Sequence, residues 1–211
     1  MVDVVALFTI VGVIALGAMS PGPSFIVVAQ TALSASPREG RLAAAGIGAA
    51  SLVVSVIAVT GLGVALVYAG WLFTVLKVAG GIYLVYLGVR MWRAHRSGAP
   101  VEAGEARAGS RRAFVPAMLT HLSNPKTIVV YGSIFATALP HDASVATLVA
   151  VPVGVTLVET AWYLIVATVL AAPGPQRAYA RSVGVVDRVA GTFLGGLGAY
   201  FAVDGIRSAL R

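Results

Sequence analysis

The chain has 211 residues, of which 58% are hydrophobic and 11% charged, and its mean hydropathy is +0.90. An ordinary soluble domain is roughly 25% charged, so this composition is that of an integral membrane protein. The 15 Lys and Arg outnumber the 8 Asp and Glu, but they cluster in connections between apolar stretches, which argues against nucleic-acid binding. The chain has no cysteine, which excludes disulfides and thiolate metal sites.

The apolar stretches predict six membrane-spanning helices. A hydrocarbon layer about 30 Å thick requires roughly 20 apolar residues per helix. Counting on this basis gives, in chain order, the segments 4–33, 42–66, 71–92, 114–139, 145–171 and 186–206. The predicted fold class is therefore an all-α integral membrane protein, and residues 1–211 form a single transmembrane domain.

The first predicted helix is interrupted by the sequence Ser20-Pro21-Gly22-Pro23-Ser24. The two prolines remove two amide donors, and the glycine accepts backbone angles that other residues avoid. We expect the helix to restart at Ser24, with Ser24 as its N-cap, and such a helix start attracts a carboxylate. A packed proline kink without function is the alternative. These five residues are the first candidate substrate-binding segment.

The fourth predicted helix is interrupted in the same way, at Asn124-Pro125-Lys126. A cation inside the membrane is costly and rarely faces lipid. Lys126 would therefore bind a substrate carboxylate or pair with Glu159; alternatively, it lies near the cytoplasmic boundary and extends its stem to the headgroups. Corresponding breaks in two halves of a membrane protein point to a transport site near the midplane. These three residues form the second candidate segment.

Glu159 is the only acid in the middle of a predicted span, whereas Asp187 and Asp204 lie near the ends of the last one. A carboxylate there would be protonated or would need a cation, so Glu159 is a candidate for proton coupling or for holding a substrate ammonium group. A structural ion pair is the alternative. His121, just before the second break, is either a buried structural histidine or a second proton-coupling candidate.

Cations in the first, third and fifth connections place these connections in the cytoplasm and both termini outside. A polar linker at about 94–112 separates the halves 1–93 and 113–211. The sequence Lys77-Val78-Ala79-Gly80 recurs as Arg188-Val189-Ala190-Gly191. Because each half has an odd number of spans, the halves would form two inverted three-helix repeats. Shared membrane composition is the alternative explanation of the recurrence.

The sequence resembles the LysE/RhtB family of bacterial amino-acid exporters over nearly its whole length. Four motifs carry the resemblance: Ser20-Pro21-Gly22-Pro23, the segment 40–48, the segment 80–88, and 114–126 ending in Asn124-Pro125-Lys126. The resemblance implies efflux of amino acids or related metabolites by a six-helix protein of the inner membrane, driven by a proton gradient or the membrane potential. It implies that the pathway is lined or shaped by Pro21, Gly22, Pro23, Asn124, Pro125 and Lys126. Ser24 and Phe25 depart from the usual family pattern, so substrate preference is not carried over.

We therefore expect a secondary-active exporter that works by alternating access, with a small-molecule substrate, the lipid bilayer as its surroundings, and neither cofactor nor metal site. Candidate acids and bases do not converge as in an enzyme active site. Two alternatives stay open: a divalent-cation efflux protein and a non-transporting membrane scaffold subunit. Small-residue faces such as Gly191 with Gly195 would allow close helix packing and a homodimer.

Overall fold

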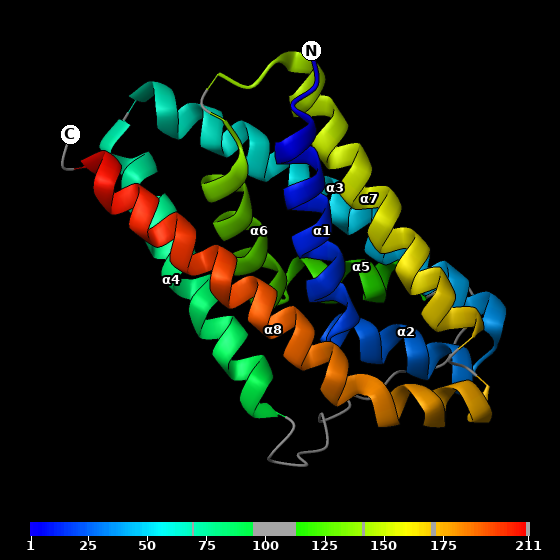
Figure 1. Ribbon diagram of the computed structural model, residues 1–211. Coiled ribbons are helices and arrows are strands. Elements are labelled where there is room, and N and C mark those ends of the chain that lie inside the picture. Colours follow the sequence, from blue (N-terminus) through cyan, green and yellow to red (C-terminus); the bar gives the residue numbers. More distant parts are fainter. Residues whose placement is uncertain (69, 95–112, 141, 170–171, 210–211) are drawn as a thin grey trace.

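The computed structural model describes residues 1–68, 70–94, 113–140, 142–169 and 172–209. All regular secondary structure in these ranges is α-helical (Figure 1). The helices are α1 (Val4–Met19), α2 (Pro23–Ser34), α3 (Pro37–Tyr68), α4 (Gly70–Ala94), α5 (Phe114–Leu122), α6 (Pro125–Ala138), α7 (Val145–Thr168) and α8 (Pro173–Ala209). The predicted linker falls almost entirely outside the described residues.

The two predicted helix breaks are confirmed. Helix α1 ends at Met19, α2 begins at Pro23, and the two are bent by 56°. Likewise α5 ends at Leu122 and α6 begins at Pro125. In both cases the new helix begins on a proline, where a missing N–H costs nothing because the first amides of a helix have no partner within it.

Two helices extend beyond their predicted spans into polar sequence. Helix α3 begins at Pro37, and the Ser36 hydroxyl accepts a hydrogen bond from the Glu39 amide at 3.2 Å. Helix α8 begins at Pro173, although its apolar, membrane-length part is Asp187–Arg207. Figure 1 shows the first turns of α8 running across the lower side of the bundle before the helix turns upward. Hydropathy locates the membrane-embedded part of a helix, whereas capping and proline placement locate its start.

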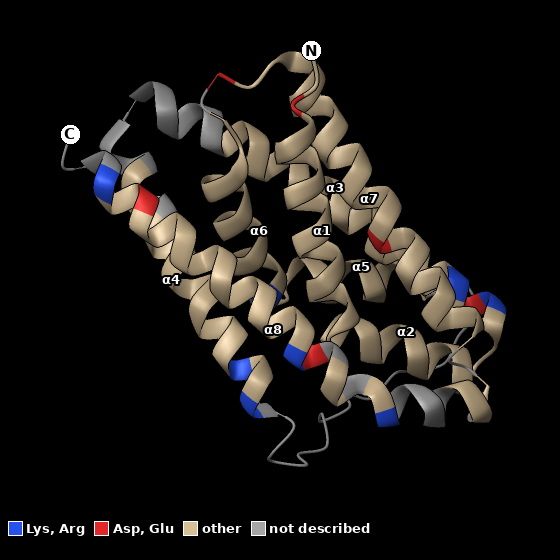
Figure 2. Ribbon diagram, viewed as in Figure 1, with Lys and Arg blue, Asp and Glu red and all other residues tan. Residues whose placement is uncertain are grey.

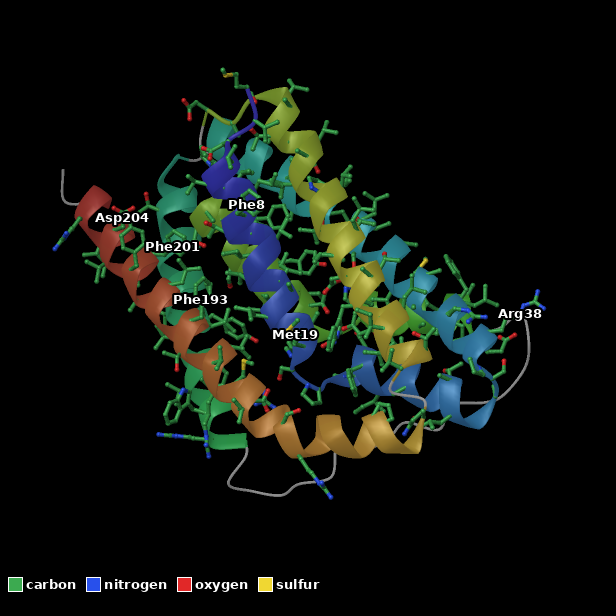
Figure 3. All side chains as sticks on the ribbon, turned by 45° about the vertical axis from the view of Figure 1, so that its right-hand side comes forward. Phe8, Met19, Arg38, Phe193, Phe201 and Asp204 are labelled. Atoms are coloured by element: carbon green, nitrogen blue, oxygen red, sulfur yellow. The ribbon has the colours of Figure 1, made fainter. Side chains whose placement is uncertain are left out.

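Among the described residues, three helical segments are long and apolar enough to cross a membrane: Pro37–Gly61, Val145–Thr168 and Asp187–Arg207. The bent pair α1 and α2 meets the same test as one broken span, and α6 contributes a shorter apolar helix. The protein is therefore a helical, multi-pass membrane protein. Many large apolar side chains are exposed, among them Phe8 and Phe193, which Figure 3 labels. In a membrane these side chains face lipid.

The helices pack in layers around α1 and α6. Helix α4 packs along α8, and α3 lies against α7 and α5 (Figure 1). Glycines set the α4–α8 spacing: a Cβ on Gly198 would lie 2.5 Å from the carbonyl oxygen of Gly81, and one on Gly191 would lie 2.7 Å from that of Gly88. Any larger residue would separate the two helices, as expected for small-residue packing in lipid.

Charged residues lie mainly at the ends of helices. Figure 2 shows cations at the lower end of α4, along the first half of α8 and at the corner between α2 and α3, with a further cation near the end of α8. Arg38 stands at the α2–α3 corner and points away from the bundle (Figure 3). Helix α1 starts and α8 ends on the opposite, upper side in Figure 1.

Candidate functional site

The two helix breaks meet in the interior of the bundle. Asn124 caps α6, because its Oδ1 accepts the Lys126 amide at 3.0 Å. Its Nδ2 donates to Ser24 Oγ at 3.4 Å, and Ser24 Oγ lies 3.0 Å from His121 Nδ1. Residues about 100 positions apart in the chain are therefore joined by hydrogen bonds. The expectation that α2 starts at Ser24 with Ser24 as its cap is wrong: Pro23 starts the helix, Gly22 is its N-cap, and the Ser24 side chain turns toward α5 and α6.

Lys126 reaches the end of α1. Its Nζ donates to the carbonyl oxygen of Gly17 at 2.9 Å and to that of Ser20 at 3.3 Å. The neighbouring carbonyl of Ala18 accepts the indole N–H of Trp162 at 3.0 Å. Lys126 is half-buried. Its ammonium group is thus bound to backbone carbonyls and is not extended toward headgroups.

Glu159 lies at the centre of a buried polar cluster, with 3% of its surface exposed. Its Oε2 accepts hydrogen bonds from Ser51 Oγ and from Tyr131 OH, the latter at 2.8 Å. His121 Nε2 lies 3.3 Å from the same oxygen and 3.4 Å from Ser51 Oγ. A buried carboxylate needs such donors, because an unsatisfied charge inside a protein is costly.

The hydrogen bonds suit one arrangement of the protons around His121. The cap makes Asn124 present its Nδ2 donor to Ser24 Oγ, and the Ser24 hydroxyl lies where it can donate onward to His121 Nδ1. In that arrangement His121 carries its hydrogen on Nε2, the atom that faces Glu159. The contacts would then form one directional chain from the second helix break to the buried carboxylate.

These side chains line one small cavity of about 30 Å³, which has room for only one or two water molecules. Its polar lining residues are Ser20, Ser24, His121, Asn124, Lys126, Thr127, Tyr131, Glu159 and Tyr163. An amino acid is much larger than this space, so it would fit only if the lining residues moved.

A second cavity of about 500 Å³ lies between α3, α4 and α6 and is mainly apolar. Helix α6 separates the two spaces: Val130 and Tyr131 face the small cavity, whereas Val129 and Ser133 face the large one. The Tyr131 ring stacks on Phe135, with 6.1 Å between centroids.

Of the predicted site residues, Ser20, Gly22, Ser24, His121, Asn124, Lys126 and Glu159 line the small cavity. Pro21 and Pro23 are not among its lining residues; Pro21 follows the end of α1, whereas Pro23 and Pro125 begin α2 and α6. Ser51 and Tyr131 were not predicted as site residues. The sequence feature that could have indicated them is a polar group within an apolar stretch.

Asp187 is the first residue of the apolar part of α8, as predicted for a residue near a span end. Because α8 begins 14 positions earlier, Asp187 also lies within a continuous helix, where it is 7% exposed and acts electrostatically on Lys126. Within the described ranges no three His, Asp or Glu side chains come together as a metal site would require.

Comparison with known proteins gives a consistent picture. A family model described as LysE type translocator matches residues 15–205. The chain is 33% identical over 200 residues to a threonine efflux protein of Salmonella typhi, covering 93% of this chain and 97% of the relative. It is 34% identical over 190 residues to a threonine efflux protein of Escherichia coli (strain K12), covering 88% and 92%. An uncharacterized membrane protein of Bacillus subtilis (strain 168) is 25% identical over 202 residues, covering 92% and 96%. No solved structure matches the chain significantly.

Proposed function

The chain belongs to the LysE-type translocator family, and on this basis we propose that it exports an amino acid from the cytoplasm across the bacterial inner membrane. The family match confirms the resemblance predicted from the motifs and makes the protein a membrane transporter, not an enzyme. Two relatives are named threonine efflux proteins, so threonine is the first substrate to test.

One observation carries the proposal: a cation and a carboxylate, Lys126 and Glu159, line the same interior cavity at the junction of two broken helices. An amino acid is a zwitterion, and a site that contains both charges complements both ends of it. Its carboxylate would bind Lys126 and the start of α2 near Ser24. Its ammonium group would bind Glu159 or the carbonyls freed at the end of α1.

We further propose that six spans form two inverted repeats, 1–93 and 113–211, that alternate around this site. In such a repeat α1, α2 and α3 correspond to α5, α6 and α7. Matching contacts support this: α1 packs on α7 as α5 packs on α3, and α2 packs on α7 as α6 packs on α3. The small volume of the cavity supports alternating access, because a substrate can enter only if helices move. In this scheme both termini lie in the periplasm.

Proton coupling is supported by the chain of hydrogen bonds from Ser24 through His121 to Glu159. Such a chain can carry a proton between the cavity and the buried carboxylate. The coupling is testable in vesicles that contain a pH-sensitive dye: a threonine gradient should drive proton movement in the parent protein. A threonine flux without any dye response would contradict it.

The experiment that tests the export proposal is counterflow in proteoliposomes. Vesicles loaded with unlabelled threonine should accumulate labelled threonine, and a panel of other amino acids defines selectivity. We expect Lys126→Ala and Glu159→Gln to lower the exchange rate at least about tenfold, the equivalent of one lost charged contact.

Two matched controls carry similar changes on exposed residues. Arg38→Ala removes an exposed cation and Asp142→Asn an exposed acid, and both should leave exchange near the parent rate. Well-folded protein that exchanges no amino acid would contradict the export proposal. Unchanged exchange in both site variants would contradict the assignment of the site.

A further inference from the structure

The end of α1 exposes carbonyls that its own chain cannot satisfy. In an α-helix the carbonyl of residue 17 accepts the amide of residue 21, and that of residue 19 accepts the amide of residue 23. Both acceptor sites face prolines here, Pro21 and Pro23, which have no N–H. Inside a membrane no bulk water replaces the missing donors.

Other helices supply donors to this helix end, including one to the Gly17 carbonyl. Helix α6 contributes the Lys126 ammonium group, which binds the Gly17 and Ser20 carbonyls at 2.9 and 3.3 Å. Helix α7 contributes the Trp162 indole to the carbonyl between them, that of Ala18. The carbonyl end of a helix carries partial negative charge, so a cation is favoured at this position.

At the second break the helix end does not depend on donors from other helices. At the end of α5 the Ser123 amide donates to the carbonyl of Leu119 at 2.9 Å, and the Asn124 amide donates to that of His121 at 3.2 Å. Local backbone donors thus complete this helix end. Because two prolines follow α1, the carbonyls at its end take an ammonium group from another helix. A single proline follows α5, and the carbonyls there are bonded to amides of the same segment.

Another ammonium group can take the place of Lys126 on these carbonyls. The hydrogen bonds that Lys126 Nζ makes go to neutral carbonyls, and Glu159 is satisfied separately by Ser51 and Tyr131. Replacing one ammonium group with another on neutral carbonyls leaves no charge unpaired, whereas opening a buried ion pair would.

We propose that the carbonyl oxygens of Gly17 and Ser20 form the subsite for the ammonium group of the substrate, and that the Lys126 ammonium group fills this subsite when the carrier is empty. The proposal rests on the proposed function and specifies which end of the zwitterion binds where. When a substrate enters, its ammonium group takes over the carbonyls. The displaced Lys126 then binds the substrate carboxylate, so the end of α1 is satisfied in both states.

Chemical rescue tests this subsite without relying on transport. Purified Lys126→Ala should have a Tm lower than that of the parent by roughly 2–10 °C, because its carbonyls lose their donor. Propylammonium chloride carries a primary ammonium group on a short stem, so it should raise the Tm of this variant saturably and leave the parent unchanged. If Lys126→Ala is not stable enough to purify, Lys126→Ser leaves the same space for the propyl stem and serves for the same measurement.

Salt and variant controls define the result. Sodium chloride or tetramethylammonium chloride at the same ionic strength should not reproduce the rescue, since neither offers an N–H donor. Trp162→Phe removes the neighbouring donor but leaves Lys126 in place, so propylammonium should not rescue it. Equal stabilisation by all three salts, or none by propylammonium, would overturn the proposal.

Competition in the parent protein tests the link to the substrate. Unlabelled threonine should inhibit labelled threonine exchange, whereas N-acetylthreonine, which has no ammonium group, should inhibit it at least about tenfold more weakly. Equal inhibition by both would overturn the ammonium assignment while leaving export intact. Absence of any exchange would instead count against the proposed function, and the amine rescue would still report on the carbonyl subsite.

Discussion

Asn124 performs two tasks that few residues can combine. Its carbonyl oxygen caps α6 at the Lys126 amide, and its amide nitrogen donates to Ser24. Serine or aspartate caps a helix as well as asparagine does, but neither has an amide donor. The second task favours one direction for the hydrogen bonds through Ser24 and His121, in which His121 presents an N–H to Glu159.

The variant Asn124→Ser separates the two tasks. A serine keeps the cap, so the Tm should stay close to that of the parent. Without the amide donor the Ser24 hydroxyl is no longer oriented toward His121, and threonine exchange should fall about tenfold, as for the loss of one buried hydrogen bond to a charged site. Counterflow and thermal unfolding of the same preparation check this.

The control for that experiment is Ser144→Asn, an exchange between the same two residue types at the N-cap of α7, where Ser144 Oγ accepts the Thr147 amide. It should change neither the Tm nor exchange appreciably. In histidine-labelled parent protein, the nitrogen spectrum should show His121 with its hydrogen on Nε2. A hydrogen on Nδ1 would contradict the directional chain.

At the level of helices, the breaks act through the donors that prolines remove. Helix α1 stops at Met19 because two of the next four residues cannot donate, and α2 leaves at 56°. Met19 is labelled at this corner in Figure 3. The bend lets the end of α1 point its carbonyls at Lys126 of α6.

Restoring one backbone amide donor should occupy a carbonyl of the proposed ammonium subsite at the end of α1. In Pro21→Ala the new amide can bond to the Gly17 carbonyl, which extends α1 and competes with Lys126 for that oxygen. We expect the Tm to be unchanged or higher, and threonine exchange to fall at least about tenfold. Counterflow and thermal unfolding measure both effects.

Pro116→Ala is the control, because this exposed proline lies in the first turn of α5, where its missing amide has no helical partner. Full exchange in Pro21→Ala would contradict a role for the freed carbonyls.

The two helix breaks were predictable from sequence because a Pro-Gly-Pro or an Asn-Pro segment ends one helix and begins the next through its own backbone and cap. A single proline does not suffice, since Pro152 lies inside the continuous helix α7. The polar start of α8 was not predictable from hydropathy, since residues outside the apolar core of a span carry no hydropathic signal. The cluster of Ser51, Tyr131 and Glu159 depends on three helices meeting. Only their packing brings one hydroxyl from α3 and another from α6 to the same oxygen.

Across the whole molecule, the distribution of charge sets the predicted orientation. In Figure 2 most cations lie at one end of the bundle or at the α2–α3 corner, whereas α1 starts and α8 ends at the other. Cations resist translocation, so the end that carries them should face the cytoplasm. A homodimer stays a prediction at this scale, and it would need a face other than Gly191 with Gly195, because these glycines pack against Gly88 of α4.

Because the chain contains no cysteine, single introduced thiols report orientation without background. Asp142→Cys places a thiol on an exposed position in the connection before α7, and Arg38→Cys places one at the exposed α2–α3 corner. In intact cells a membrane-impermeant maleimide should label the first and not the second, and permeabilised cells should label both. The reverse pattern would invert the orientation, and labelling of both in intact cells would contradict an odd number of crossings between the two positions.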